Sequence, residues 1–235
     1  VVEAAGPGGG PRGGAPGGGL AGPGGGALRG LRGASPRLGI LLIADEVVTG
    51  FRIAWGGATA LYGVTPDLVA YGKIIGGGYP LGAVAGRREV LELANPRAKG
   101  QGYTYISGTL NGNPLSAAAG LATLGELEKP GVYERLNALG QRLRDGLGAA
   151  ARAAGRSAQV LGVGPMANIY FTPRPVRDYR DAQGEDRALK LRLQRDLLVA
   201  GHLTNPWAKL YLSTAHQEAD LDATLEVAAD SLRRG

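Results

Sequence analysis

The sequence contains no cysteine and only two histidines among its 235 residues. Without cysteine, the chain can form neither a disulfide framework nor a thiolate metal site. The two histidines, His202 and His216, do not stand at the spacing of metal ligands, so we expect no bound metal. The lack of cysteine also fits a reducing compartment, and we expect a cytoplasmic location.

The sequence also lacks long apolar runs. It has no uninterrupted apolar stretch of about 20 residues, so we expect no membrane-spanning helix. No apolar segment follows a basic start at the N-terminus, and we therefore expect no signal peptide.

The positive charge is not concentrated into a binding surface. The formal net charge is +6, of which residues 1–38 carry half, because they hold four arginines against Glu3 alone. The remaining positive charge is spread along the chain among acidic residues. No basic stripe with interleaved aromatic residues is present, so we expect no nucleic-acid partner.

Glycine is abundant, with 42 residues, and it is concentrated at the start of the chain. Residues 1–38 consist almost entirely of Gly, Pro, Ala, Leu and Arg and show no apolar period. Such a stretch loses too much chain entropy to become ordered by itself. We predict that residues 1–38 are a disordered or aberrant segment, with a strand stub at Val1, Val2 and Glu3.

The remaining sequence has the pattern of an α/β protein. Short apolar runs predict strands at 40–44, 68–71 and 81–85, and the continuous run at 40–44 is typical of a parallel sheet. A short helix is predicted at 87–93, and Asn113 followed by Pro114 predicts the start of a longer one. We expect these elements to form a domain over 39–127.

Residues 128–235 are predicted to form a small α+β domain. Leucines at 136, 139, 143 and 147 indicate one helix, and a helix capped by Asp186 carries leucines at 189, 193 and 197. The last helix carries leucines at 221, 225 and 232. Strands are predicted between these helices at 159–163, 168–172 and 210–213.

Two residues are the main candidates for a chemical role. Asp45 ends the first of these strands, and Lys73 follows the next one and precedes three consecutive glycines. Ligands of open parallel sheets bind beyond the carboxyl ends of the strands, so both side chains are expected to face one crevice. A lysine that is partly desolvated there favours its neutral, nucleophilic amine. An amine and an acid so placed match pyridoxal phosphate chemistry, in which the acid keeps the pyridine nitrogen protonated.

Three segments of the sequence resemble the class III pyridoxal-phosphate aminotransferases, and the branch most similar is that of glutamate-1-semialdehyde aminomutase. They are Asp45-Glu46-Val47-Val48-Thr49-Gly50-Phe51-Arg52, Gly72-Lys73-Ile74-Ile75-Gly76-Gly77-Gly78 and Ser107-Gly108-Thr109-Leu110-Asn111-Gly112-Asn113-Pro114. The resemblance covers roughly residues 39–235. It implies the fold of the fold-type I transferases, with 39–127 as the remainder of the large cofactor-binding domain and 128–235 as the small C-terminal domain.

The resemblance also implies roles for individual residues. Lys73 would form the Schiff base with the cofactor and carry protons, Asp45 would bond the pyridine nitrogen, and Val47 would pack against the ring. Gly108 and Thr109 would bind the cofactor phosphate of a partner subunit, which implies a homodimer. Tyr105 falls where relatives often have an active-site tyrosine.

Some parts of the family pattern are not matched. Family members carry a phosphate-binding loop and a ring-stacking aromatic residue before the strand that ends at Asp45, and the Gly/Pro-rich segment stands in that place here. We therefore expect a C-terminal fragment whose residues 1–38 are misread GC-rich coding sequence. Residues 201–207 also depart from the aminomutase pattern.

The function implied is transfer of an amino group between an amino acid or amine and a keto acid or aldehyde, through pyridoxal phosphate on Lys73. Two alternatives remain open. One is a glutamate-1-semialdehyde 2,1-aminomutase, which returns the amino group to the same molecule. The other is a catalytically inactive aminotransferase fragment.

Overall fold

The computed structural model describes residues 2–5, 25–97, 100–204 and 209–234. These residues divide into two compact units: residues 2–5 and 25–129 belong to the first unit, and residues 130–204 and 209–234 to the second. The second unit begins two residues after the boundary expected from the sequence.

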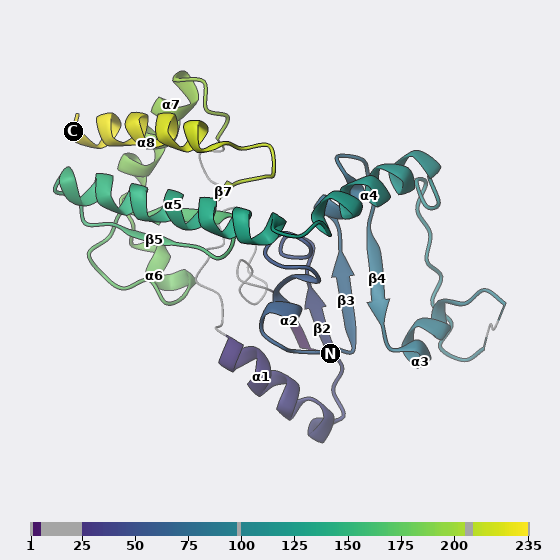
Figure 1. Cartoon of the computed structure of the whole chain (residues 1–235). Helices are drawn as coiled ribbons and strands as arrows, with labels where there is room; N and C mark the ends of the chain where they lie inside the picture. Colours follow the sequence, from purple (N-terminus) through teal and green to yellow (C-terminus); the bar gives the residue numbers. More distant parts are fainter. Residues whose placement is uncertain (1, 6–24, 98–99, 205–208, 235) are drawn as a thin grey trace. The chain divides into compact units, whose positions relative to one another are not determined.

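The first unit contains a four-stranded sheet. Its order is β1 (Val2–Ala5), β2 (Leu42–Asp45), β3 (Leu68–Tyr71) and β4 (Ala83–Gly86). β1, β2 and β3 are parallel, and β4 is antiparallel to β3. Figure 1 shows β2, β3 and β4 side by side. The predicted mostly parallel sheet is confirmed, although β2 and β4 each begin two residues later than predicted.

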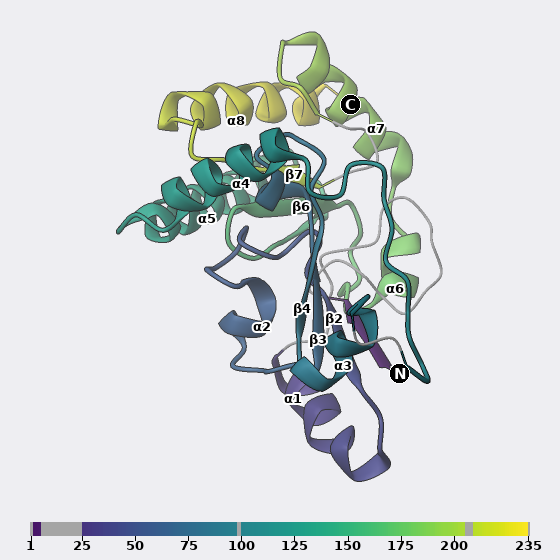
Figure 2. The same cartoon turned by 90° about the vertical axis from the view of Figure 1, so that its right-hand side faces the viewer.

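Short helices connect and follow these strands. They are α1 (Gly25–Ala34), η1 (Pro36–Leu38), α2 (Gly57–Leu61), η2 (Lys73–Gly76), α3 (Arg88–Leu91), η3 (Glu92–Ala94) and α4 (Pro114–Leu127), where η marks a 3₁₀-helix. Figure 2 shows α3 near the ends of β3 and β4. The predicted cap of α4 is confirmed, because Asn113 Oδ1 accepts the N–H groups of Leu115 at 3.0 Å and Ser116 at 3.1 Å.

The structure corrects the expectation of disorder for residues 25–38, which form α1 and η1. The helix has no apolar period in its sequence, and it is instead stabilised by contacts with residues distant in the chain. Leu28 is buried in a small cluster with Leu42 and Val64. Arg32 Nη1 lies 2.8 Å from Asp67 Oδ2, which anchors the helix to the start of β3. The part of the prediction that falls on residues 6–24 lies outside the described residues.

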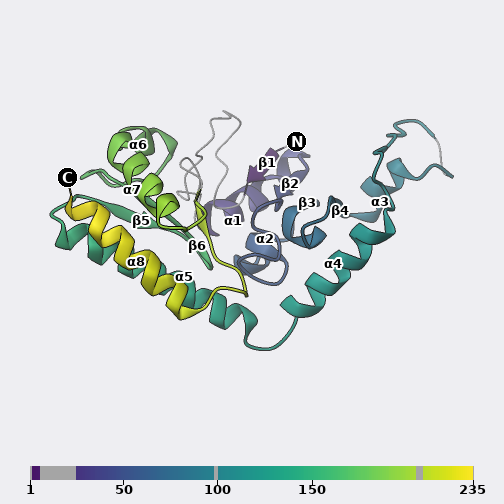
Figure 3. The same ribbon diagram turned by 90° about the horizontal axis from the view of Figure 1, so that it is seen from above.

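The second unit is an α+β module, as predicted. Strands β5 (Gln159–Leu161), β6 (Met166–Tyr170) and β7 (Leu210–Tyr211) form an antiparallel sheet. Its helices are α5 (Val132–Ala153), α6 (Tyr179–Gln183), α7 (Arg187–Val199) and α8 (Glu218–Arg233). Figure 3 shows α5 and α8 running side by side. In the described part of the chain, no helix is long and apolar enough to cross a membrane.

The leucine pattern of the sequence builds the core of the second unit. One cluster of buried side chains joins α5, β6, α7 and α8, and Leu147, Leu197 and Leu232 are fully enclosed in it. The predicted cap of α7 is also confirmed, because Asp186 Oδ1 accepts the N–H of Leu189 at 3.0 Å. Helix α6 was not predicted, because a five-residue helix is too short to show the apolar period of a helix.

Candidate active site

Asp45 and Lys73 stand at the same edge of the first unit's sheet. Asp45 is the last residue of β2 and pairs with Ala70 of the parallel strand β3. β3 ends at Tyr71, Gly72 follows, and Lys73 opens η2. The carboxyl ends of the two strands therefore place both residues at one edge of the sheet, and that their side chains face one crevice stays a prediction.

The carboxylate of Asp45 is half-buried and oriented by the backbone. Its Oδ1 accepts the N–H of Val47 at 2.9 Å. Among the described residues, no group donates a hydrogen bond to Oδ2. The N–H of Glu46 donates to the carbonyl oxygen of Ala70 at 2.9 Å, so pairing with β3 continues one residue past Asp45. Asp45 thus presents a fixed acceptor at the sheet edge.

Lys73 has an unusual backbone conformation. Its φ is 52°, in the left-handed region that residues other than glycine rarely adopt. Such strain is concentrated at functional sites, where the surrounding structure holds it in place. The side chain is exposed, which corrects the expectation of partial desolvation. Among the described residues, none forms an ion pair or hydrogen bond with its amine.

Two glycines let the segments after β2 and β3 approach each other. An ideal Cβ on Gly72 would lie 3.4 Å from Val47 Cγ1, so the Val47 side chain sits beside the lysine loop. A Cβ on Gly50 would lie 2.6 Å from the carbonyl oxygen of Glu46 and would also overlap the Tyr71 ring. Any larger residue at position 50 must therefore move one of these segments.

Helix α4 supports the lysine loop from its other side. A Cβ on Gly120 would overlap the carbonyl oxygen of Ile75 in η2, which shows how closely the helix backbone approaches the loop. Gly77 ends η2 with a φ of 56°, and a Cβ there would lie 2.6 Å from the carbonyl oxygen of Ala119. Packing and backbone conformation therefore both favour glycine at position 77.

Two buried carboxylates hold these segments in place, and no sequence pattern indicated a role for either. Glu46 accepts hydrogen bonds from the backbone N–H groups of Ala58 at 2.9 Å and Thr59 at 2.6 Å, and from the Thr49 hydroxyl. It thereby ties the residue after Asp45 to α2. This role could not be inferred from the sequence, because the burial of Glu46 depends on contacts with α2.

Asp67 is the second buried carboxylate. Its Oδ2 accepts the N–H of Leu42 at 2.8 Å, and its oxygens lie 2.8 Å from Arg32 and 3.3 Å from Arg87. The pKa of Asp67 is lowered, chiefly by the Leu42 hydrogen bond against the opposing effect of burial, and further by Arg87 and Arg32. Asp67 therefore joins the starts of β2 and β3, the strands that carry the site.

Gly108 and Thr109 lie in an exposed loop before α4. The loop is closed by a hydrogen bond of 3.0 Å from the N–H of Asn111 to the carbonyl oxygen of Gly108. Within the described residues, no hydrogen bond or ion pair joins this pair to Asp45, Val47 or Lys73. Tyr105 is also exposed, at 76%.

The described residues contain no group of three or more acidic or histidine side chains that could hold a metal ion. The sheet edge offers an exposed amine at Lys73, a carboxylate acceptor at Asp45 and the apolar side chain of Val47. An exposed amine suits an electrophile, and a carboxylate acceptor suits a protonated nitrogen.

Comparison with known proteins connects this geometry to a family. Residues 15–200 match the family model described as aminotransferase class-III. The chain is 45% identical over 210 residues to the glutamate-1-semialdehyde 2,1-aminomutase of Desulforudis audaxviator, covering 88% of this chain and 48% of that protein. It is 43% identical to glutamate-1-semialdehyde 2,1-aminomutase 2 of Brevibacillus brevis, over 89% of this chain and 48% of that protein.

Solved structures agree with these relatives. An omega-transaminase from Sphaerobacter thermophilus matches with a TM-score of 0.83 and 38% identity, over 90% of this chain and 48% of that one. A beta-phenylalanine aminotransferase from Variovorax paradoxus matches with a TM-score of 0.81 and 33% identity, over 92% and 50%. The chain spans about half the length of the relatives it matches. It belongs to the class III aminotransferase family.

Proposed function

We propose that this chain is part of a pyridoxal-phosphate-dependent aminotransferase. The reaction moves an amino group between an amino acid or amine and a keto acid or aldehyde. The observation that carries the proposal is the placement of Asp45 and Lys73 at the carboxyl ends of adjacent parallel strands. The family match and the transaminases among the solved structures support it.

The residues present fit the cofactor. Asp45 keeps one carboxylate oxygen without a hydrogen bond from any described residue, and this oxygen suits the protonated nitrogen of a pyridine ring. Lys73 presents an amine that no described carboxylate neutralises. Val47 lies next to Gly72 and offers an apolar surface for the ring face.

When bound, pyridoxal phosphate supplies an aldehyde that reacts with amines and a ring that withdraws electrons from the substrate carbon. Asp45 would hold the proton on the ring nitrogen through its Oδ2. Lys73 Nζ would hold the cofactor and move a proton at the substrate carbon. Asp45 and Val47 would orient the ring relative to Lys73.

We further propose that the chain works as a homodimer, in which Gly108 and Thr109 bind the cofactor phosphate of the partner subunit. The exposed position of their loop supports this role. On this proposal the first unit is the remainder of the cofactor-binding domain, and the second unit is the small C-terminal domain. A cytoplasmic location accords with a chain that has no cysteine.

A second candidate is a glutamate-1-semialdehyde 2,1-aminomutase, because relatives of that name are 43–45% identical to this chain. The two functions differ in the fate of the amino group. With a ¹⁵N-labelled amino donor, a transaminase passes the label to a second carbonyl compound, whereas an aminomutase keeps it within one molecule.

The first test is titration of the purified chain with pyridoxal phosphate, followed by borohydride reduction and tryptic mapping. Lys73 is the only lysine between Arg52 and Arg87. Trypsin does not cut at a modified lysine, so specific labelling yields an intact peptide of residues 53–87. Lys73→Ala should abolish the visible absorbance band, and Lys129→Ala, at an exposed lysine of the same unit, should not.

An adduct confined to Lys73 supports the proposed cofactor site. Equal labelling of several lysines, or the same absorbance band in Lys73→Ala, overturns it for this chain. In that case the alternative hypothesis of a catalytically inactive aminotransferase fragment would apply.

A further inference from the structure

Two residues of the first unit have strained backbones, and one aromatic side chain connects their segments. Among the described residues, Phe51 and Lys73 are the two residues other than glycine with a positive φ, at 55° and 52°. This left-handed conformation is rare outside glycine and persists only where the surrounding structure holds it. Tyr71 contacts the ring of Phe51 and precedes Lys73 by two residues. Tyr71 is therefore placed to act on both.

The ring of Tyr71 packs on the segment that follows β2. Its centroid lies 5.2 Å from that of Phe51, with the ring planes tilted by 50°. It also covers Gly50, since an ideal Cβ on that glycine would overlap the ring. Trp55 contacts Phe51 edge-on, with centroids 5.1 Å apart. Both ring pairs have the separation and tilt of favourable aromatic contacts. The three rings thus tie the segment after β2 to the end of β3.

Only Gly72 separates Tyr71 from Lys73, and that glycine is enclosed. It is buried and extended, with a φ of −170° and a ψ of −162°. An ideal Cβ on Gly72 would lie 3.4 Å from Val47 Cγ1. Tyr71 itself is the last residue of β3, where it pairs with Ala83 of β4. Because a single enclosed residue links them, a displacement of Tyr71 is passed on to the backbone of Lys73.

The hydroxyl group of Tyr71 contributes less than its ring. It lies 3.5 Å from the carbonyl oxygen of Gly56, at the limit of a hydrogen bond. Burial raises the pKa of this hydroxyl, and the Glu46 carboxylate raises it further. The side chain thus stays neutral near neutral pH and adds no charge to the site. Phenylalanine should therefore replace Tyr71, whereas leucine, which has no ring, should not.

We propose that Tyr71 is a positioning residue for Lys73: its ring, packed on Gly50 and Phe51, fixes the Lys73 backbone relative to the strand that carries Asp45. This inference rests on the proposed function, in which Asp45 and Lys73 act on one cofactor. In this role Tyr71 takes part in no bond change. It sets the separation and orientation of the two groups that do, so that less ordering is needed when the cofactor binds.

The test compares three variants of the full chain in the pyridoxal phosphate titration. Tyr71→Leu removes the ring, Tyr71→Phe keeps it, and Tyr62→Leu removes a ring elsewhere in the first unit. Tyr62 packs against the small cluster of Leu28, Leu42 and Val64. Tyr62→Leu is therefore a matched control for lost packing.

Tyr71→Leu should raise the apparent dissociation constant of the absorbance band at Lys73 roughly tenfold. It should also shift the pH midpoint of that band, because the protonation of an amine depends on its distance from a neighbouring carboxylate. Tyr71→Phe should stay within about twofold of the unchanged chain and keep its pH midpoint. Tyr62→Leu should melt lower but keep the midpoint. An unchanged midpoint in Tyr71→Leu, or an equal shift in Tyr62→Leu, overturns the positioning role.

Phe51→Leu tests whether the two rings act together. If Tyr71 acts through Phe51, the double variant should bind pyridoxal phosphate about as weakly as Tyr71→Leu alone. Losses that multiply in the double variant would show that the rings act independently and would overturn the proposed link.

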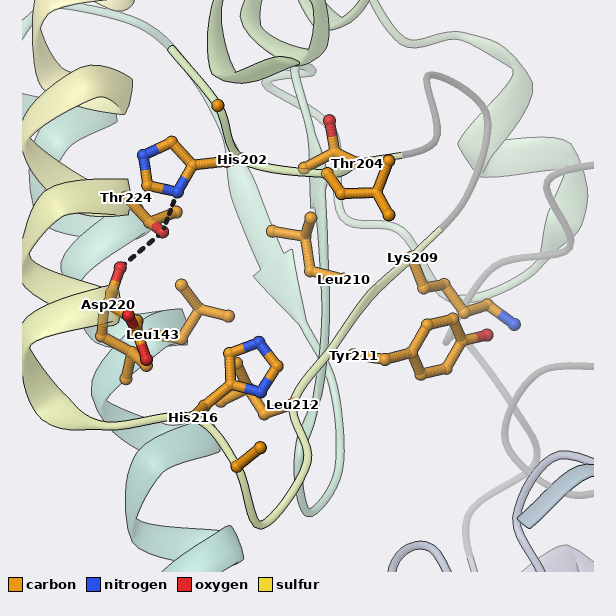
Figure 4. Close-up of a pocket in the computed structure, with 14 residues that line it drawn as sticks. Leu143, His202, Thr204, Lys209, Leu210, Tyr211, Leu212, His216, Asp220 and Thr224 are labelled. Carbon is orange, nitrogen blue, oxygen red and sulfur yellow. Dashed lines mark hydrogen bonds between the residues drawn. The ribbon is translucent and has the colours of Figure 1, made fainter. Parts of the chain in front are cut away.

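The two histidines report the folding of the second unit in each variant. Both line a pocket of 720 Å³ beside β7 (Figure 4). His202 Nδ1 lies 3.0 Å from Thr224 Oγ1, and His216 Nδ1 accepts the N–H of Ser213 at 3.0 Å. The imidazole NMR signals of both should be unchanged in the variants, which confines the effect to the first unit.

Amide hydrogen exchange without cofactor separates this inference from the proposed function. Tyr71→Leu should speed exchange in peptides that cover η2 roughly fivefold more than Tyr62→Leu does. If the unchanged chain forms no band at Lys73, the proposed function fails, and the exchange result still decides whether Tyr71 holds the lysine loop. Equal exchange of η2 in the two variants overturns that role.

Discussion

In the second unit, α5, α7 and α8 bury leucines against one face of β6, whereas the first unit ties its strands together through two buried carboxylates. Leu147, Leu197 and Leu232 have no measurable exposure. In the first unit, by contrast, β4 is exposed along its whole length, and Leu121 of α4 is 73% exposed. The second unit is therefore stabilised mainly by apolar burial, and the first unit depends more on directed hydrogen bonds.

This difference predicts different responses of the two units. Apolar burial depends little on pH, but a carboxylate with a lowered pKa loses its contribution in acid. We therefore expect amide hydrogen exchange to be slower in the helices of the second unit than in β2 and β3. Hydrogen exchange read peptide by peptide follows the two units separately.

Leu147→Ala should have the largest effect. Leu147 is fully buried among the side chains of α5, β6 and α8, so its truncation leaves a cavity. The expected loss is about 2–5 kcal/mol in the free energy of unfolding of the second unit. Leu198→Ala, at a 46% exposed position of α7, should cost less than about 0.5 kcal/mol. Equal losses would show that the second unit has no packed core.

Asp67→Asn should destabilise the first unit by about 2–3 kcal/mol, because a charged acceptor of hydrogen bonds from Leu42, Arg32 and Arg87 becomes neutral. The measurement is denaturant unfolding followed by exchange in β2 and β3. Peptides of the second unit should be unaffected.

The same residue predicts a pH dependence. The pKa of Asp67 is lower in the folded chain than in the unfolded chain, mainly because of the Leu42 N–H. Its contribution is present above the unfolded pKa of about 3.9 and is lost as the pH falls through the folded pKa. Stability of the first unit should therefore fall below about pH 4, and less steeply in Asp67→Asn. An unchanged acid profile in the variant would contradict this role.

Gly120→Ala should loosen the support of the lysine loop. The added methyl group would overlap the carbonyl oxygen of Ile75, so α4 and η2 must separate. We expect a loss of about 1–3 kcal/mol and weaker pyridoxal phosphate labelling of Lys73. Gly125→Ala is the matched control in the same helix, since its Cβ would meet nothing within 4 Å. That variant should be neutral or stabilised by up to about 1 kcal/mol.

The smallest expected loss of stability comes from removing a helix N-cap, and one such cap can be compared in each unit. Asn113→Ala removes the acceptor of two N–H groups of α4, and Asp186→Ala removes the acceptor of one N–H group of α7. Each should cost about 1 kcal/mol. Exchange should rise in the first turn of the affected helix only. A rise that spreads through the whole unit would mean that the cap also holds tertiary structure.

Elements with a strong local signal were predictable. β3 was predicted at its observed bounds, because its apolar run is bounded by Asp67 and Gly72. The starts of α4 and α7 followed from Asn113 and Asp186, whose side chains fit the N-cap position. Helix α1 was not predictable, since its stability comes from contacts of Leu28 and Arg32 with residues distant in the sequence.

The sequence by itself determined the family resemblance, the helices α5, α7 and α8 of the second unit, and the placement of Asp45 and Lys73 at one edge of the sheet. These features depend on periodicity, on short motifs, and on the rule that parallel strands present their carboxyl ends at one edge. Only the tertiary structure decided that Glu46 and Asp67 anchor the strands, that Lys73 is exposed, and that His216 faces a pocket. Such properties depend on which distant segments meet, and no local pattern of residues encodes the geometry of those contacts.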